Sequence, residues 1–333
     1  MNLFNTSTNT DESIFYFVRH GEADYDSLGD WNDFHMGRDF APLTDKGRKQ
    51  IAKTAKELRE VSPQIIITSP YTRAMETANI ISRELNLPIV VEKNLHEWVS
   101  DTTHTRGKAE ELLPLCDDFT QSAGIHFNGA KDWESSAALR SRVLGVLEKY
   151  RGYERIVVVG HALMMDAVIG AMRPYENGEI VTYKAKKQGK LPGMTYYPPD
   201  TLENMGFVSI FARYQGKWIY CWHKRRQSFE RPGGHVESGE SALEAAKREL
   251  YEESGITDCT FTALCDYEFV WDTGVNSNNG RYYYAEVHSL GEIPESEMDR
   301  IELFDEVPKN CTYDRATEQA MLKLVDKVLA KLR

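Results

Sequence analysis

IFYFVRHGEAD, residues 14–24, runs from five apolar and aromatic residues directly into an arginine, His20 and a glycine. An apolar run of this length is typical of a buried strand. A second run, RIVVVGHALM at residues 155–164, ends in the same way at His161. Because ligands of parallel sheets bind beyond the carboxyl ends of the strands, we expect the two imidazoles to meet at one sheet edge.

Strand and helix patterns alternate through the first half of the chain. This alternation predicts a mostly parallel sheet with helices on both faces, a three-layer α/β/α domain. Ser69 and a following proline are expected to start the second helix as its N-cap and first-turn residue. The expected strands are 14–18, 64–69, 88–92 and 156–159, and the expected helices are a segment following LTDKG (43–47), a segment reaching residue 85, and residues 110–119, 133–150 and 162–172.

A change of pattern predicts a second domain. Residues 186–200 are rich in Gly and Pro and are the best candidate for a linker or a domain edge, so we expect domains at 1–200 and 201–333. Beyond the linker, strands at 206–214 and 217–223 flank Gln-Gly, a hairpin signal. Further strands at 261–271 and 281–288 and a closing helix at 314–332 complete the expected elements.

Composition narrows the partners and the compartment. The net charge of -11 disfavours a nucleic-acid backbone as the main partner. No apolar run approaches the ~20 residues of a membrane span, and the first residues lack the features of a signal peptide, so we expect a cytoplasmic protein without membrane contact. Five cysteines without CxxC spacing are expected to be reduced thiols.

Five residues are expected to share the sheet edge where the two histidines lie: Arg19, His20, Arg73, Glu97 and His161. Arginine forks match phosphate oxygens, and an imidazole can attack phosphorus and carry the phosphoryl group. A carboxylic acid can protonate the leaving oxygen and then deprotonate water. The second imidazole can stabilise charge on the phosphoryl oxygens. This chemistry needs no metal.

The motifs VRHGEA, PLTDKG, SPYTRAMETA and VVVGHA, in this order, resemble the histidine phosphatase superfamily, which includes phosphoglycerate mutases. The resemblance covers about residues 13–185. It implies that His20 is the phosphorylated nucleophile and that Glu97 is the proton donor, with no cofactor. The phosphate pocket that it implies is completed by Arg19, Arg73 and His161.

One position departs from the family pattern. Many members carry an asparagine six residues after the nucleophile, whereas this chain carries Asp26. A carboxylate that faces a phosphate dianion is unfavourable, so an impaired or specialised phosphatase is an alternative. The other histidines are expected to be surface or structural residues: His35, His96, His104, His126, His223, His235 and His288.

GGHVESGESALEAAKRELYEESGI, residues 233–256, predicts a capped helix with an acidic face. Ser241 and Glu244 form a capping-box pattern. Three acids at helical spacing repel one another by roughly 0.2–0.5 kcal/mol per pair. Such clustering favours a hard cation, Mg²⁺ or Mn²⁺, at the three glutamates Glu249, Glu252 and Glu253.

The pattern G-x5-E-x7-R-E-L-x-E-E-x-G-I in this stretch resembles a complete Nudix box. The resemblance covers about residues 204–333 and implies an α/β/α sandwich with a mixed sheet that hydrolyses a nucleoside diphosphate linked to another group. It implies a metal bound by Glu249, Glu252, Glu253 and the Gly233 carbonyl, with Glu253 also a candidate base and Glu240 and Arg248 orienting the ligands. A further metal-binding acid is sought among Glu286, Glu302 and Glu306, and a base-stacking surface among Phe207, Trp218, Trp222, Phe229, Trp271 and Tyr282–Tyr284.

We therefore expect a bifunctional phosphohydrolase that acts on small phosphorylated metabolites, nucleotides above all. Its second domain would cleave a nucleoside triphosphate or another diphosphate with Mg²⁺ or Mn²⁺, and its first would remove a terminal phosphate without metal. The alternatives are a degenerate first domain that senses a phosphorylated ligand, and a mutase that depends on a bisphosphate. The sequence does not predict the oligomeric state.

Overall fold

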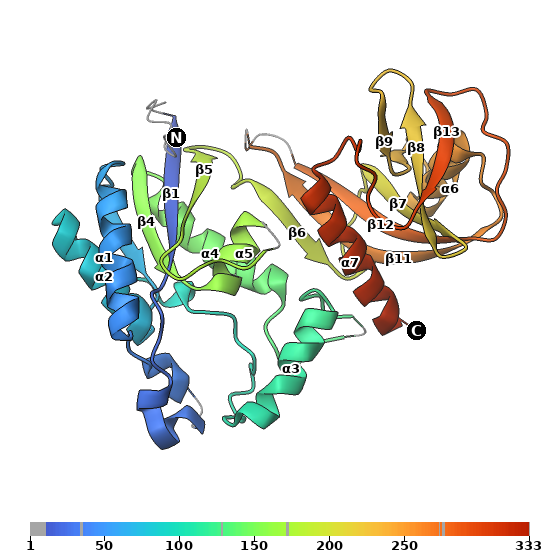
Figure 1. The fold of residues 1–333 in the computed structure, drawn as a ribbon. Coiled ribbons are helices and arrows are strands. Elements are labelled where there is room, and N and C mark those ends of the chain that lie inside the picture. The colour runs from blue at the N-terminus through green and yellow to red at the C-terminus, as the bar shows by residue number, and fades with distance from the viewer. Residues whose placement is uncertain are drawn as a thin grey trace. The chain divides into compact units, whose positions relative to one another are not determined.

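The computed structural model describes residues 11–33, 36–127, 129–170, 173–272, 274 and 277–332 (Figure 1). The chain forms two compact units. The first unit comprises residues 1–120, 129–194 and 270–276, and the second unit comprises residues 121–128, 195–269 and 277–333. The predicted domain ranges 1–200 and 201–333 stay predictions.

A five-stranded sheet in the order β3-β2-β4-β1-β5 forms the centre of the first unit. Its first four strands are mutually parallel, and β5 pairs antiparallel to β1. The sequence patterns predicted the four parallel strands and missed β5. The strands are β1 (Glu12–Arg19), β2 (Ile65–Thr68), β3 (Ile89–Val91), β4 (Arg155–Gly160) and β5 (Ile180–Lys186).

Alternate side chains of β1 enter two different cores. Phe15 and Phe17 pack in the cluster that holds α4 and α5, whereas Tyr16 and Val18 pack in the cluster that holds α1 and α2. The period of two along a strand thus produces helices on both faces of the sheet, as Figure 1 shows. The helices are α1 (Asp45–Arg59), α2 (Thr72–Leu85), α3 (Ala109–Gln121), α4 (Ser136–Tyr150) and α5 (Ala162–Ile169), and the short 3₁₀ turns are η1 (Asp26–Asp33), η2 (Gly37–Phe40) and η3 (Lys93–Leu95).

An eight-stranded mixed sheet forms the second unit, so the predicted fold class is confirmed for both parts of the chain. β7 and β12 are parallel neighbours, while β7 and β8 form the predicted antiparallel hairpin. Its turn residues, Gln215 and Gly216, have φ of 49° and 82°. The strands are β6 (Gly193–Tyr197), β7 (Phe207–Tyr214), β8 (Lys217–His223), β9 (Ser228–Glu230), β10 (Gly233–His235), β11 (Cys259–Val270), β12 (Ser277–Val287) and β13 (Met298–Phe304).

Two helices pack on this sheet. α6 (Ala242–Ser254) buries Ala246 and Leu250 against β7 and β12. α7 (Arg315–Leu332) reaches the sheet through polar contacts, such as the hydrogen bond from the Tyr220 hydroxyl to Glu318 at 3.0 Å. The predicted capping box is confirmed, because the side chains of Ser241 and Glu244 each accept the other's backbone N–H.

The boundary between the two units, after Met194, falls inside the stretch 186–200 that was expected to be a linker or domain edge, although this stretch also contains β6 of the eight-stranded sheet. Two local predictions are wrong. α2 begins at Thr72, and its N-cap is Tyr71 rather than Ser69, whose hydroxyl has another partner. α5 ends at Ile169, because Gly170 adopts a left-handed conformation that closes the helix before the predicted end at 172.

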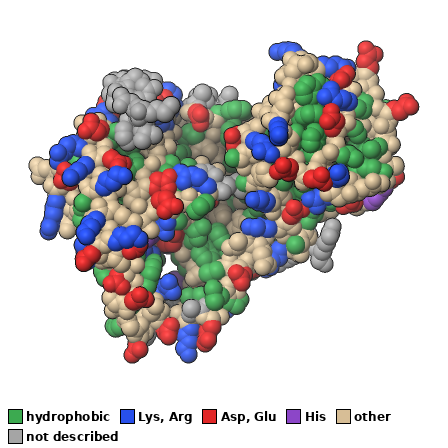
Figure 2. All heavy atoms as spheres, in the orientation of Figure 1, with side chains coloured by type: hydrophobic (Ala, Val, Ile, Leu, Met, Phe, Trp, Pro, Cys, Tyr) green, Lys and Arg blue, Asp and Glu red, His purple; other side chains and the backbone are tan. Residues whose placement is uncertain are grey.

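The surface carries charges of both signs. Among the described residues on the face drawn in Figure 2, basic and acidic side chains are interspersed and neither gathers into one dominant patch. None of the helices in the described part of the chain has the length and apolar composition needed to cross a membrane.

A tight crossing holds the loop after β1 against the start of α1. The Thr44 N–H donates to the Glu22 carbonyl at 2.9 Å, and the Thr44 hydroxyl accepts from the Gly47 N–H. A Cβ added at Gly47 would lie 2.3 Å from the Glu22 carbonyl oxygen, which is backbone and cannot move aside. The glycine in PLTDKG is therefore a requirement of close backbone approach.

Gly47→Ala is expected to lower the free energy of unfolding by about 1–3 kcal/mol, as overpacking does. Gly145→Ala is the matched control, because Gly145 is an exposed helical glycine with no atom within 4 Å of an added Cβ. The control should gain about 0.5–1 kcal/mol from higher helix propensity. Urea unfolding followed by circular dichroism measures both, and equal effects of the two substitutions would contradict the crossing.

Candidate active sites

Parallel pairing of β1 with β4 brings the two predicted histidines together. Arg19 pairs with Gly160 in this register, so the next residues, His20 and His161, leave adjacent strands at the same edge. The centroids of their rings lie 5.2 Å apart. The predicted convergence of the two imidazoles is what the structure shows.

Hydrogen bonds determine which nitrogen of His20 is free to react. Nδ1 lies 2.7 Å from the Gly21 carbonyl oxygen, which can only accept, so Nδ1 carries the proton and Nε2 carries the lone pair. Nε of Arg73, in the first turn of α2, donates to this Nε2 at 3.2 Å. An unprotonated nitrogen beside a guanidinium is suited to attack a phosphoryl group that the guanidinium binds.

Electrostatics keep this histidine neutral. Burial, together with the positive charges of Arg73 and Arg19, lowers the pKa of His20 to about 3 against the opposing effect of the Gly21 carbonyl. Burial also lowers the pKa of His161 well below its usual range, and Arg73 adds to the effect. His20 is therefore a base over the whole physiological pH range.

Two buried nitrogen atoms of this cluster lack hydrogen-bond partners: Nε of Arg19 and Nδ1 of His161. Buried polar atoms are nearly always satisfied, so such orphans call for a ligand. The other nitrogen of His161 shares a 2.7 Å hydrogen bond with the Ser69 hydroxyl, and Nη1 of Arg19 donates to the Tyr175 carbonyl. The oxygens of an anion such as phosphate could accept hydrogen bonds from both of these nitrogen atoms.

Glu97 lies at the N-terminus of α5 and lines a cavity beside this cluster. Oε1 accepts the N–H groups of Trp98 and Met164 at 2.9 and 3.0 Å, and Oε2 accepts that of Leu163 at 3.3 Å. Burial raises the pKa of Glu97, and these N–H donors and Arg73 only partly oppose the rise. A carboxyl group with a raised pKa, lining a cavity together with Arg73, is suited to act as a general acid.

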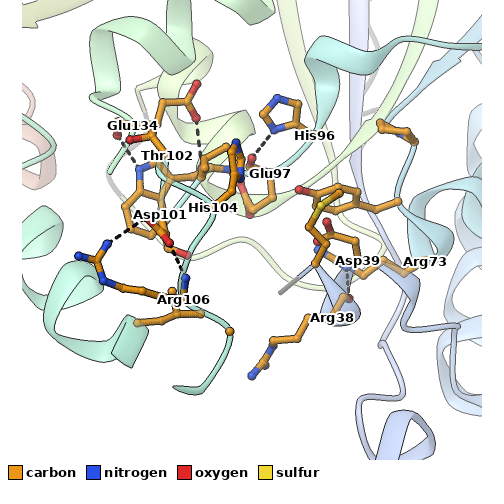
Figure 3. Close-up of a pocket in the computed structure, with 18 of the residues that line it drawn as sticks. Arg38, Asp39, Arg73, His96, Glu97, Asp101, Thr102, His104, Arg106 and Glu134 are labelled. Carbon is orange, nitrogen blue, oxygen red and sulfur yellow. Dashed lines mark hydrogen bonds and ion pairs between the residues drawn. The ribbon is translucent and has the colours of Figure 1, made fainter. Parts of the chain in front are cut away.

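Four residues that line the cavity were not among the site residues expected from the sequence: Arg38, Asp39, His96 and His104. Figure 3 shows Arg38, Asp39 and Arg73 on one side of the cavity, with His96 and Glu97 next to them. His96 and His104, expected to be surface or structural residues, both line the cavity. His35 lies outside the described residues. Asp26, the departure from the family pattern, is exposed at the start of η1.

The acidic helix face lies on α6 as predicted, and Arg248 organises it. Nε and Nη2 of Arg248 each donate to Glu240 at 2.9 Å. Nη1 donates to Glu249 at 2.8 Å and to Glu252 at 3.1 Å. The arginine therefore links three carboxylates and holds two of the predicted metal ligands in place, in keeping with the predicted orienting role of Arg248 and Glu240.

Glu253 is the buried member of the acidic set. Burial, together with nearby carboxylates, Glu249 first, raises the pKa of Glu253 to about 8. The Gly233 N–H donates to its Oε2 at 3.1 Å and opposes the shift. A cation that binds beside a buried carboxyl group surrounded by negative charge stabilises its ionised form.

The donor set fits a hard divalent cation, but the side chains do not enclose one. Among the described residues, no three His, Cys, Asp or Glu side chains are gathered closely enough to hold a metal ion. Arg248 lies against two of the glutamates instead. A Cβ on Gly234 would lie 2.2 Å from the Glu249 carboxylate, so a side chain at this position would displace that carboxylate from the loop.

The three acids named as candidates for a further metal ligand each have a protein partner in the structure, and their role stays a prediction. Glu302 pairs with Arg300 at 2.7 Å, and Glu306 lies 3.5 Å from Arg315. Glu286 accepts a hydrogen bond from the Tyr284 hydroxyl. The acids whose charges raise the pKa of Glu253, besides Glu249, are Glu297 and Glu230.

The two sites define a chain with two phosphate-handling domains, and comparison with protein families agrees. Residues 15–189, more than half of the chain, match the model of the histidine phosphatase superfamily (branch 1). Residues 203–327 match the model of the NUDIX domain. The chain therefore belongs to the histidine phosphatase superfamily and carries a NUDIX domain after it. Both are hydrolase families, and NUDIX domains generally use Mg²⁺ or Mn²⁺.

Relatives match one part of the chain each. The "Uncharacterized phosphatase PhoE" of Bacillus subtilis is 31% identical over 157 residues, 46% of this chain and 73% of that protein. The "Putative 8-oxo-dGTP diphosphatase YtkD" of the same organism is 34% identical over 113 residues, 32% of this chain and 67% of that protein. The crystal structure of a mutant of the Bacillus subtilis pyrophosphohydrolase BsRppH aligns with 42% of this chain and 88% of its own at 26% identity, with a TM-score of 0.35.

Glu97→Gln is expected to distinguish substrates by their leaving groups. Release of an alcohol from glycerol 2-phosphate needs a proton, so its kcat/KM should fall about 10²–10⁴-fold. Nitrophenolate leaves without a proton. In a stopped-flow burst with p-nitrophenyl phosphate, the substitution should therefore slow the release of the first equivalent of nitrophenolate far less. Equal loss with both substrates would contradict the role of Glu97.

The pH dependence should agree. Since the pKa of Glu97 is raised, the protonated acid persists above the usual range of a glutamate, while His20, with a pKa of about 3, stays a base. For wild type, kcat/KM for glycerol 2-phosphate should fall as pH rises through the pKa of Glu97. The Glu97→Gln variant should lose this limb, and its persistence would assign it to another group.

Proposed function

We propose that the chain is a bifunctional phosphohydrolase. The first unit would hydrolyse phosphomonoesters through a phosphohistidine on His20, and the second would hydrolyse a nucleoside diphosphate linkage, that of a nucleoside triphosphate above all, with Mg²⁺ or Mn²⁺. The observation that carries the first activity is the unprotonated Nε2 of His20, 3.2 Å from Nε of Arg73, beside two orphan buried nitrogens. The observations that support the second activity are the acidic face of α6 and the similarity of the chain to YtkD.

The phosphatase reaction would proceed in two displacements. In the first, Nε2 of His20 forms a bond to phosphorus while the bond from phosphorus to the leaving oxygen breaks, and Glu97 gives that oxygen its proton. In the second, Glu97 takes a proton from water as the water oxygen displaces Nε2, which releases inorganic phosphate. Arg19, Arg73 and His161 would hold the phosphoryl oxygens in both steps.

The diphosphate reaction would depend on the carboxylates of α6. Glu249, Glu252 and Glu253, with the Gly233 carbonyl, would hold the cation, which neutralises diphosphate oxygens and lowers the pKa of water. Glu253, the buried carboxylate of the set, is also the candidate base. Arg248 would keep Glu249 and Glu252 in position through its contacts with both.

Two substitutions should separate the activities. His20→Ala is expected to abolish phosphomonoester hydrolysis and to leave metal-dependent diphosphate cleavage nearly intact, because the residues lie in different units. Glu253→Gln should do the reverse, since a neutral amide attracts a divalent cation less and cannot act as a base. Phosphate and pyrophosphate release from p-nitrophenyl phosphate and from a panel of nucleoside triphosphates measures both.

EDTA supplies the independent control. It should stop diphosphate cleavage in wild type and leave the His20 reaction running, because arginines and histidines rather than a metal hold the phosphate there. Equal EDTA sensitivity of both reactions, in protein that circular dichroism shows to be folded, would contradict this account. Failure of the His20-dependent reaction in residues 1–200 as well as in the full chain would favour a phospho-ligand sensor.

A further inference from the structure

A cavity of about 620 Å³ opens beside the phosphate cluster, and the first unit supplies all of its lining. Arg73 and Glu97, the residues that would bind the phosphoryl group and protonate the leaving oxygen, both line it. The leaving group of a bound phosphomonoester would therefore extend into this space. Cavities of ~300–1,000 Å³ accommodate drug-sized ligands, so the space suits an alcohol of that size.

One wall of the cavity contains two carboxylates that accept hydrogen bonds from neighbouring protein groups. Asp101 accepts the backbone N–H of Thr103 at 3.0 Å and of Arg106 at 2.8 Å, and also Nη1 of Arg106 at 3.0 Å (Figure 3). Glu134 is held in the same way by Nε of Arg142 at 2.6 Å. These carboxylates are already satisfied by protein donors, so they shape the wall without needing a ligand.

The opposite wall presents rings. Tyr25, Tyr71 and His96 all line the cavity and are partly exposed. The rings of Tyr71 and His96 lie 6.3 Å apart between centroids and are inclined by only 30°. Nδ1 of His96 lies 2.7 Å from the Glu97 carbonyl oxygen, so it carries the proton, and Nε2 remains a hydrogen-bond acceptor.

Guanidinium groups extend this ring surface. The Cζ atom of Arg38 lies 4.6 Å from the centroid of the Tyr25 ring, and that of Arg73 lies 5.0 Å from the centroid of Tyr71. Arg38 is exposed, and among the described residues no carboxylate lies within ion-pair distance of it. Tyrosine rings and arginine planes together form the kind of platform on which nucleobases stack.

We propose that this cavity binds the nucleoside of a nucleoside 5′-monophosphate, with the base stacked on Tyr25 and Tyr71 and a sugar or base donor bonded to Nε2 of His96. The inference rests on the proposed reaction of His20. Nε2 of His20 bonds to phosphorus, the bond from phosphorus to O5′ breaks, and the Glu97 proton passes to O5′ to release the nucleoside. Tyr25 and Tyr71 determine specificity and take no part in the bond changes.

The test compares selectivity, kcat/KM for AMP and GMP divided by kcat/KM for glycerol 2-phosphate, in the presence of EDTA. Wild type should favour the nucleotides, and Tyr25→Leu and Tyr71→Leu should each lower the selectivity by about 10-fold through KM, as expected for loss of one stacking ring. Tyr153→Leu is the matched control, because Tyr153 is an exposed tyrosine of the same unit. It precedes the start of β4, whereas His161 follows the end of that strand, so the two residues lie at opposite ends of β4. The control should keep wild-type selectivity.

Several results would overturn the inference. If wild type hydrolyses glycerol 2-phosphate as well as AMP and GMP, the cavity does not recognise a nucleoside, although the proposed function of His20 stands. A preference for 3-phosphoglycerate that Arg38→Ala removes would make the cavity a site for a second anion.

Binding gives a readout that does not depend on turnover. Calorimetric titration of AMP into the His20→Ala protein, in buffer that contains EDTA, should show binding. The affinity of the double variant His20→Ala/Tyr25→Leu for AMP should be about 10-fold weaker. Binding unaffected by Tyr25→Leu and by Tyr71→Leu would contradict the inference. Absence of any His20-dependent hydrolysis, with ring-dependent AMP binding retained, would refute the proposed reaction and leave the nucleoside pocket supported.

Discussion

The parallel pairing of β1 with β4 is the constraint on which the first site depends. One register, Arg19 opposite Gly160, places His20 and His161 side by side. A shift of one residue would turn these side chains to opposite faces and would also invert the cores, since Phe15 and Tyr16 enter different clusters. The hydrophobic pattern that folds the sheet is thus the same pattern that assembles the site.

The candidate sites of the two units are built from opposite charges. Around His20, burial and the charges of Arg73 and Arg19 lower the pKa of the histidine to about 3, in surroundings that suit an anion. Around Glu253, burial and the nearby carboxylates raise the pKa of this glutamate to about 8, in surroundings that suit a cation. In the proposed function, the first arrangement would attract phosphate directly and the second would attract it through a metal, so that the two reactions would be independent.

Local rules predicted much of this, and tertiary contacts supplied the rest. The strand-end rule predicted that His20 and His161 meet, and the helix pattern predicted the capping box of α6. Ser69 was taken for a helix cap because Ser-Pro is a common start signal, whereas its hydroxyl bonds to His161, 92 residues away. No sequence pattern around His96 predicts that it lines the cavity, because segments far apart in the sequence form that cavity. β6 was missed since its flanking Gly and Pro residues resemble a linker.

Isolation of the covalent intermediate tests the central claim most directly. Rapid acid-free quenching during turnover of ³²P-labelled substrate, followed by peptide mass spectrometry and ³¹P NMR, should locate an alkali-stable, acid-labile phosphate on Nε2 of His20. The proton that Nδ1 donates to Gly21 leaves only this nitrogen free to react. Phosphate on Nδ1, on another residue, or on the His20→Ala protein during continued turnover would contradict the account.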